Sequence, residues 1–297
     1  MRAGIGRGRP ARWAAWLLAG MVALAAAGCS MVKLGYENLP MLVVWEVSGV
    51  LDLDANQKRI VERHAAEIRE WHRRRQLPEY VRFIADAEAG LERAPGPETI
   101  TQWRERLLAS WYPLAERLAP AVAELGVTLR PAQLARLDDE FARLNRETRA
   151  EYKVDAPREV RERARRERFE KRAESLLGYL TDEQRQLIRT SSSSVSDERA
   201  WWALREARQR MFSELLARLA RERPDPERAA SMARETLTGL YWAVDADVRA
   251  SIERRAEAAD ALAAQLLQRS SVAQRRKLVE TLRGYGNDFA TLAARAG

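Results

Sequence analysis

Apolar residues recur at spacings of three and four along almost the whole chain, and this periodicity restricts the fold more than any other feature. Gly and Pro, which interrupt helices, account for only 15 and 11 of the 297 residues, and no Asn-Gly hairpin turn occurs. The sequence therefore predicts an all-α fold, an elongated helical bundle or cradle. The clearest apolar run consists of Ile100, Trp103, Leu107, Trp111, Leu114, Leu118, Val122 and Leu125.

Several breaks divide this pattern into separate helices. Those that contain proline lie at residues 77–78, 94–97, 130–131, 156–157 and 223–226. The segment from Pro226 to Gln268 has only one breaker, Gly239, and would be about 60 Å long as one continuous helix. The run Ser191–Ser194 predicts a kink or a short linker, because serine hydroxyls compete for backbone hydrogen bonds.

The N-terminus has the layout of a secretory signal peptide. Four arginines precede an uncharged, mostly apolar stretch over residues 13–24, and the small residues 25–28 follow as a cleavage region. The apolar stretch is too short to cross a bilayer, which takes about 20 residues. The only cysteine of the chain, Cys29, stands directly after this segment.

Ala27-Gly28-Cys29 resembles the lipobox of bacterial lipoproteins, although Ala26 stands where that motif usually has Leu. The resemblance implies a signal peptide at 1–28, cleavage before Cys29 and acylation of its thiol, with palmitate among the attached chains. Ser30 rather than Asp follows the cysteine, which by the usual sorting rule implies the inner leaflet of the outer membrane, facing the periplasm. The alternatives are an ordinary secretory signal or an uncleaved anchor.

The charge of the mature chain is close to balanced. Once the four signal arginines are removed from the 51 basic residues, the net charge falls from +8 to +4. Basic and acidic residues alternate at helical spacings, as solvated helix faces do, so we expect no nucleic-acid partner. With Cys29 acylated no disulfide can form, and helix packing must stabilise the fold.

A short motif recurs at helix starts. Asp54 with Gln57, Thr181 with Gln184 and Ser271 with Gln274 have the spacing of a capping box, in which the first side chain caps the helix and Gln returns to the N-cap N–H. A fourth, looser copy pairs Arg130 with Gln133, where Arg spoils the cap. Each Gln is followed four positions later by an apolar residue: Val61, Leu137, Ile188 and Leu278.

The order of these copies predicts an internal repeat. The copies at 54 and 130 lie 76 residues apart and those at 181 and 271 lie 90 apart. We predict a lipidated tether and apolar segment at 29–49, a first helical half at 50–155, a connecting charged helix at 156–177 and a second half at 178–297. The alternative is chance, because capping boxes are common and Thr99–Gln102 has the same spacing.

The motif Leu180-Thr181-x-x-Gln184 is similar to the LTxxQ pattern of the Spy/CpxP family of periplasmic stress proteins. That resemblance implies a thin helical cradle, usually dimeric, that binds unfolded clients. The segments Lys33–Asn38, Leu51–Leu53, Trp71–Arg74 and Leu77–Tyr80 resemble a proteobacterial lipoprotein family of unknown function. This second resemblance implies fold and location, and no activity.

Residues for catalysis or metal binding are scarce. His64 and His72 are eight apart on one predicted helix, whereas helical metal pairs use a spacing of four. We expect His64 to be a partly buried core residue and His72 to lie on the helix surface. Nucleotide-binding and nucleophile motifs are missing from the sequence, so we predict no enzyme, no cofactor and no metal site.

Three features are candidates for binding. The apolar stretch 41–51 contacts the membrane interface with Trp45 at headgroup level, or packs on the bundle as a buried first element. Trp201 and Trp202 cannot share one helix face, so one lies at a contact between the halves or is exposed as an anchor. The last feature is the basic run with Arg163, Arg165, Arg166 and Arg168, for which a solvated helix face is the alternative.

Together these features predict a periplasmic lipoprotein that binds envelope proteins or unfolded polypeptides, chaperone-like or as an assembly accessory. One alternative is a structural scaffold lipoprotein with one defined partner. A second is an envelope hydrolase whose carboxylate site has no recognisable motif.

Overall fold

The computed structural model describes residues 35–191, 198–240 and 243–294. The chain forms two compact units, Met1–Asn38 and Leu39–Gly297. Only residues 35–38 of the first unit are described, so the predicted signal peptide and Cys29 lie outside the described residues.

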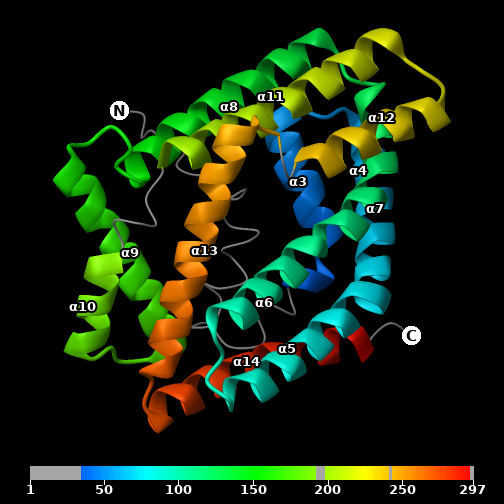
Figure 1. Cartoon of the computed structure of the whole chain (residues 1–297). Coiled ribbons are helices and arrows are strands. Elements are labelled where there is room, and N and C mark those ends of the chain that lie inside the picture. The colour runs from blue at the N-terminus through cyan, green and yellow to red at the C-terminus, as the bar shows by residue number, and fades with distance from the viewer. Residues whose placement is uncertain (1–34, 192–197, 241–242, 295–297) are drawn as a thin grey trace, which may run out of the picture. The chain divides into compact units, whose positions relative to one another are not determined.

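The described part of the second unit is helical and contains no strand (Figure 1), which confirms the all-α prediction. None of the described helices combines the length and the apolar character that a membrane span requires. In chain order the elements are α3 (Leu39–Leu51), α4 (Ala55–Trp71), the π-helical turn η2 (His72–Gln76), α5 (Leu77–Leu91), α6 (Pro97–Ala109), α7 (Trp111–Gly126), α8 (Pro131–Glu151), α9 (Arg158–Leu177), α10 (Asp182–Ser191), α11 (Glu198–Glu222), α12 (Pro226–Gly239), α13 (Ala246–Gln268) and α14 (Val272–Ala294).

Local sequence explains where several helices begin. Proline occupies the first turn of α6, α8 and α12, where its missing N–H costs no hydrogen bond. The segment from Pro226 to Gln268 does not form one continuous helix. Instead α12 ends at Gly239, and α13 starts anew because the carboxylate of Asp245 accepts the N–H of Val248 at 2.9 Å.

The break predicted at Leu77-Pro78 is a π-helical turn rather than a loop. In η2 the N–H of Leu77 bonds to the carbonyl of His72, five residues back. Pro78 follows in the first turn of α5, where no N–H is needed. The chain therefore passes from α4 to α5 without leaving helical geometry.

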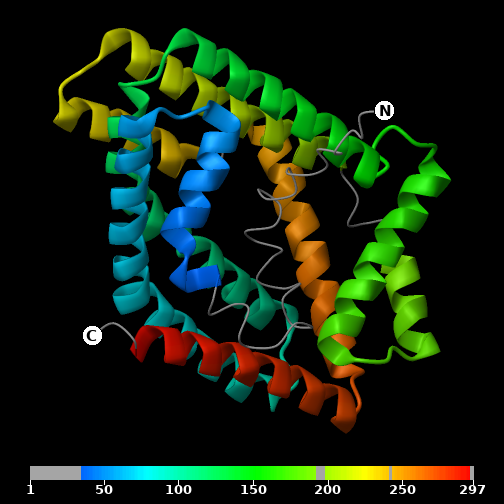
Figure 2. The same cartoon turned by 180° about the vertical axis from the view of Figure 1, so that it is seen from behind.

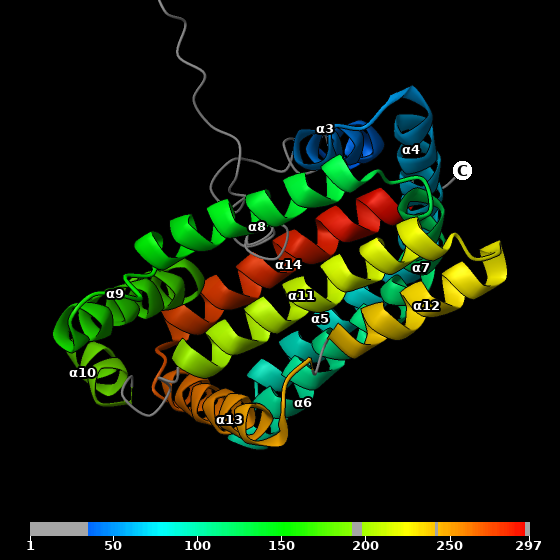
Figure 3. The ribbon, with the colours of Figure 1, turned by 90° about the horizontal axis from the view of Figure 1, so that it is seen from above.

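Helices from the two predicted halves pack directly on one another. α12 packs on α7 and α14 runs along α5 (Figure 2), while α13 lies beside α6. α11 contacts both α8 and α12 (Figure 3). Gly126 permits the close approach of α7 to α11, since a Cβ there would lie 2.7 Å from a methyl of Leu219.

Two hydrophobic cores result, and each contains residues from both halves. The first joins α3, α4, α7 and α8 to α11 and α12, with Ala119, Leu219 and Ala233 fully buried. The second joins Leu91 of α5 to α9, α10, α13 and α14, around Leu180 and Ile188. The two halves therefore share their cores rather than folding around one each.

Candidate functional site

A first glutamine pair, Gln57 and Gln133, joins the starts of α4 and α8. Nε2 of Gln57 donates to Oε1 of Gln133 at 3.1 Å, and Nε2 of Gln133 donates back to Oε1 of Gln57 at 2.8 Å. Both side chains are buried. Two residues 76 positions apart thus form a closed amide–amide contact inside the protein.

A second glutamine pair, Gln184 and Gln274, joins the starts of α10 and α14 in the same way. Nε2 of Gln184 donates to Oε1 of Gln274 at 3.0 Å, and the return bond is 2.8 Å long. These side chains are buried as well. The two pairs are therefore built from the four glutamines that the repeated motif singles out.

The remaining hydrogen bonds of the four amides also follow one rule. Each Oε1 accepts the N–H of the N-cap residue of its own helix. Each Nε2 gives its other hydrogen to a carbonyl that lies just before the N-cap of the partner helix. In three amides this carbonyl lies two residues before the N-cap and belongs to Thr128, Arg269 or Tyr179, whereas Nε2 of Gln133 lies 3.0 Å from the carbonyl oxygen of Leu51 and 3.2 Å from that of Asp52. Both hydrogens and both lone pairs of every amide are used, as burial of an amide requires.

Thr99–Gln102, which has the same spacing as the motif, is not a helix start, because α6 begins at Pro97.

The residues around the motif are buried at matching positions. The residue before each cap is at most 6% exposed: Leu53, Leu129, Leu180 and Ser270. The apolar residue four positions after each Gln is at most 8% exposed: Val61, Leu137, Ile188 and Leu278.

The caps themselves differ between the pairs. Oδ1 of Asp54 accepts the N–H groups of Asn56 and Gln57, each at 3.0 Å. In the second pair the hydroxyls of Thr181 and Ser271 each accept the N–H of their motif glutamine at 3.2 Å.

Arg130 cannot cap α8, because a guanidinium has no hydrogen-bond acceptor. It donates instead to Oδ2 of Asp54 at 2.8 Å, so that it links the two helix starts from outside. The hydrogen bond from the backbone N–H of Gln57 and that from Arg130 lower the pKa of Asp54.

Trp201 and Trp202 take part in an internal contact between the halves. Trp201 stacks on Tyr152 of the first half with ring centroids 5.6 Å apart. Trp201 therefore lies at a contact between the halves, which is one of the two predicted alternatives. Trp202 is 8% exposed and its Nε1 donates to Glu206. Arg149 lies 4.9 Å from the centroid of the Trp202 ring. Trp202 is therefore a core residue, and the expectation of an exposed anchor does not apply to it.

The predicted basic run lies on α9 and is not a uniform solvent face. Arg163 is exposed, whereas Arg165 and Arg166 are partly buried. Arg168 lies 4.6 Å from the ring centroid of Tyr152 and so contributes to the same aromatic contact. The six residues predicted to form one binding surface thus divide between an exposed helix face and the packing of α8, α9 and α11.

A groove of about 520 Å³ is lined by residues of α6, the start of α7, α11 and α13. We call it the α6–α13 groove. Its apolar lining consists of Leu108, Ala109, Tyr112, Leu204, Ile252 and Ala256. Its charged lining consists of Arg104, Glu105, Arg208, Glu253 and Glu257.

The two arginines of the α6–α13 groove are held by neighbouring groups. Nε of Arg104 donates to Oδ2 of the buried Asp260 at 2.9 Å, and Thr101 donates to the same oxygen at 2.8 Å. Nε of Arg208 donates to the carbonyl of Leu240 at 2.6 Å. Glu105, Glu253 and Glu257 then give the groove an acidic lining.

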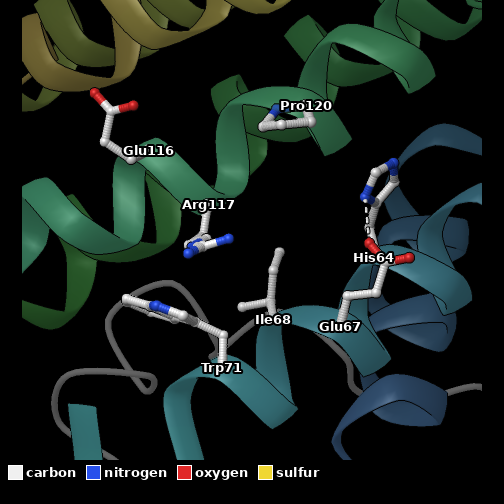
Figure 4. Close-up of a pocket in the computed structure, with 7 residues that line it drawn as sticks. All are labelled: His64, Glu67, Ile68, Trp71, Glu116, Arg117 and Pro120. Carbon is white, nitrogen blue, oxygen red and sulfur yellow. Dashed lines mark ion pairs between the residues drawn. The ribbon is translucent and has the colours of Figure 1, made fainter. Parts of the chain in front are cut away.

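A second hollow, of about 370 Å³, lies between α4 and α7 (Figure 4). His64 on its wall is 7% exposed, as the sequence predicts for a core residue, and its Nε2 lies 2.8 Å from Oε2 of Glu124. Across the hollow, the guanidinium of Arg117 lies 5.5 Å from the ring centroid of Trp71.

His72 differs from the expectation of a surface residue. It is only partly exposed, the centroid of its ring lies 5.8 Å from that of Tyr80 in an edge-to-face arrangement, and burial lowers its pKa to about 4. Within the described residues no group of three His, Cys, Asp or Glu side chains is placed to hold a metal ion.

Comparison with known proteins identifies one family. The model of the DUF6279 family, described as a family of unknown function, matches residues 49–236, which is more than half of the chain. No curated protein and no solved structure matches the chain. The matched region contains the first glutamine pair and Gln184, and it ends before Gln274.

Proposed function

Because the chain belongs to the DUF6279 family, whose function is unknown, we propose a function from its groove and its N-terminal motif. It is an envelope lipoprotein, anchored to the inner leaflet of the outer membrane, that binds other polypeptides in the periplasm and catalyses no reaction. The role is that of a chaperone-like or assembly accessory protein.

The α6–α13 groove is the observation that carries this proposal. Leu108, Tyr112 and Ile252 offer apolar surface to an incoming side chain, whose burial contributes about 25 cal/mol per Å². The three glutamates of the lining favour basic groups next to that side chain. The groove therefore suits a polypeptide segment in which an apolar residue has Lys or Arg beside it.

The glutamine pairs have a structural role inside the fold. They provide a physical reason for the motif on which the resemblance to the Spy/CpxP family rests, because each Gln satisfies a helix start and its partner helix together. The anchor is supported by Ala27-Gly28-Cys29. Binding does not depend on the basic run of α9, since the glutamates of the groove favour basic clients.

A scaffold lipoprotein with one defined partner is the second candidate. The burial of Trp202 favours it, because a broad surface for many clients would offer its aromatic rings to solvent.

Photo-crosslinking in living cells separates these two candidates. A photoreactive residue at position 108 lines the groove, whereas the same residue at 107 lies on an exposed position of α6 outside it. Many adducts from 108 and few from 107 are expected of a chaperone-like protein. One adduct from 108 identifies a scaffold, and equal patterns from both positions contradict a role for the groove.

Suppression of aggregation tests the same groove in solution. The chain should slow the aggregation of an unrelated unfolding protein without nucleotide, and added salt should weaken this effect. Leu108→Glu should reduce the activity about tenfold, whereas Leu107→Glu should leave it unchanged. A folded chain that is inert toward several unfolding proteins would contradict the chaperone-like role.

The anchor has its own test. Cys29→Ser removes the only thiol of the chain, so it should abolish labelling by a fatty acid and release the protein from membranes. Labelling that survives the substitution would overturn the lipoprotein assignment.

A further inference from the structure

Helix α3 has two apolar faces with different surroundings. On one face, Val43, Val44, Val47 and Val50 pack against the first hydrophobic core. On the other face, Met41 and Trp45 are 61% and 54% exposed. Figure 3 shows α3 at the margin of the second unit, beside α8 and α4. Both interpretations of this segment thus have support, since it packs on the bundle and still presents apolar side chains to the outside.

The exposed face of α3 carries no charge of its own. Glu46 is the only charged residue in the helix, and it is partly buried. Burial, and after it the charge of Glu140 on α8, raises the pKa of Glu46. The one charged residue of α3 is thus partly buried, and the exposed side of the helix with Met41 and Trp45 is apolar.

The length of the tether indicates what covers this face. Leu39 follows Cys29 by ten residues, which span at most about 35 Å when fully extended. An acylated Cys29 would thus keep α3 within that distance of the bilayer surface. Tryptophan favours the headgroup region, where its apolar ring and its N–H are both accommodated.

A basic residue of the neighbouring helix α8 lies beside the C-terminal end of α3. Arg136 of α8 is exposed and donates to the carbonyl of Gly49 in α3 at 3.2 Å. A cation beside an apolar face suits a surface of anionic phospholipid, to which each such residue contributes attraction.

We propose that the face of α3 formed by Met41 and Trp45 rests in the headgroup region of the membrane to which Cys29 is anchored. At 13 residues α3 is too short to cross the bilayer, so it lies along the surface as a second contact beside the lipid. This inference rests on the proposed anchor. The membrane contact would hold the protein in one orientation.

The test uses the full chain in vesicles of phosphatidylethanolamine and phosphatidylglycerol. Because Cys29 is the only cysteine and is acylated in the proposal, Met41→Cys introduces a single reactive thiol for a fluorescent dye. Tyr179→Cys is the matched control, since Tyr179 is 75% exposed and far from α3 in sequence. Quenching is measured with nitroxide-labelled lipid and with aqueous iodide.

The dye at position 41 should be quenched by the nitroxide lipid and be at least about twofold less sensitive to iodide than the dye at 179. Equal iodide sensitivity at both positions would overturn the inference. Protection of position 41 from both quenchers would also overturn it, because a protein partner or a second copy would then cover the face.

The number of dyes per chain tests the anchor separately. One dye on Met41→Cys is expected for an acylated Cys29, and two dyes would contradict acylation. In that case the same quenching is measured with the double variant Cys29→Ser, Met41→Cys and added vesicles. Lipid quenching there would support the membrane face, and its absence would overturn it.

Discussion

The two glutamine pairs use the same amide contacts but different caps. In each pair the reciprocal bonds measure 2.8 Å in one direction and 3.0–3.1 Å in the other. The first pair has an Asp and an Arg at the cap positions, joined by an ion pair, whereas the second has the neutral Thr181 and Ser271. The glutamine is thus the constant part of the motif in its four copies, whereas the residue at the cap position varies.

Arg130 explains how one cap can be lost. The N–H of Gln133 lacks a side-chain acceptor at the start of α8, but the Gln133 amide still closes the return bond to Arg130. Pro131 removes a second N–H that would need a partner. The first pair thus tolerates an imperfect cap and gains a charged link between two helices.

The largest expected effect comes from breaking one member of a pair. Gln184→Met leaves buried groups of Gln274 and the carbonyl of Arg269 without partners, which should lower the free energy of unfolding by about 3 kcal/mol. Gln186→Met on the exposed face of α10 is the control and should change it by less than about 0.5 kcal/mol. Denaturant unfolding measures both. Similar values for the two variants would mean that the pair does not stabilise the fold.

A smaller effect distinguishes the caps. Thr181→Ala removes an acceptor for the N–H of Gln184 and should cost about 1 kcal/mol. Arg130→Ala removes only a solvent-exposed ion pair and should cost less than about 0.5 kcal/mol. Equal shifts of the melting temperature would contradict the difference between the two pairs.

The smallest effect is a dependence on pH that only the first pair should have. The pKa of Asp54 is lowered from its ordinary value of 3.8, so its contribution to stability is present above that value and is lost as the pH falls through the lower, folded pKa. The difference in melting temperature between wild type and Asp54→Asn should therefore shrink as the pH is lowered below 3.8. The difference between wild type and Thr181→Ala should stay constant, and a shrinking of both would assign the effect to other carboxylates.

The sequence predicted the helical class and the four helix starts that carry the motif, because both depend on local patterns. Capping boxes involve residues three apart, and apolar periodicity involves neighbours on one helix. The sequence did not show that the four glutamines meet in pairs. The presence of two copies of the motif in each predicted half was a signal that could have suggested this pairing. The break between α12 and α13 is not evident from the sequence, because no proline marks it and only the N-cap Asp245 signals the new helix.

The candidate site was harder to predict than the fold. The α6–α13 groove joins residues from three regions of the chain, and Arg104 and Asp260 are 156 positions apart. No local pattern marks such a contact, because it depends on how α6 packs against α13. Trp201 and Trp202 were evident from the sequence, but the packing of Trp201 on Tyr152 was one of two alternatives that periodicity cannot separate.

A double-mutant cycle on each glutamine pair tests the central claim most directly, that the two pairs are equivalent structural units. Each glutamine is replaced by Met singly and together, and the coupling energy is obtained from the four free energies of unfolding. We predict a coupling of about 2 kcal/mol in each pair, equal within about 0.5 kcal/mol, because the second substitution removes a partner that the first has already left unsatisfied. A coupling near zero in either pair would contradict the account.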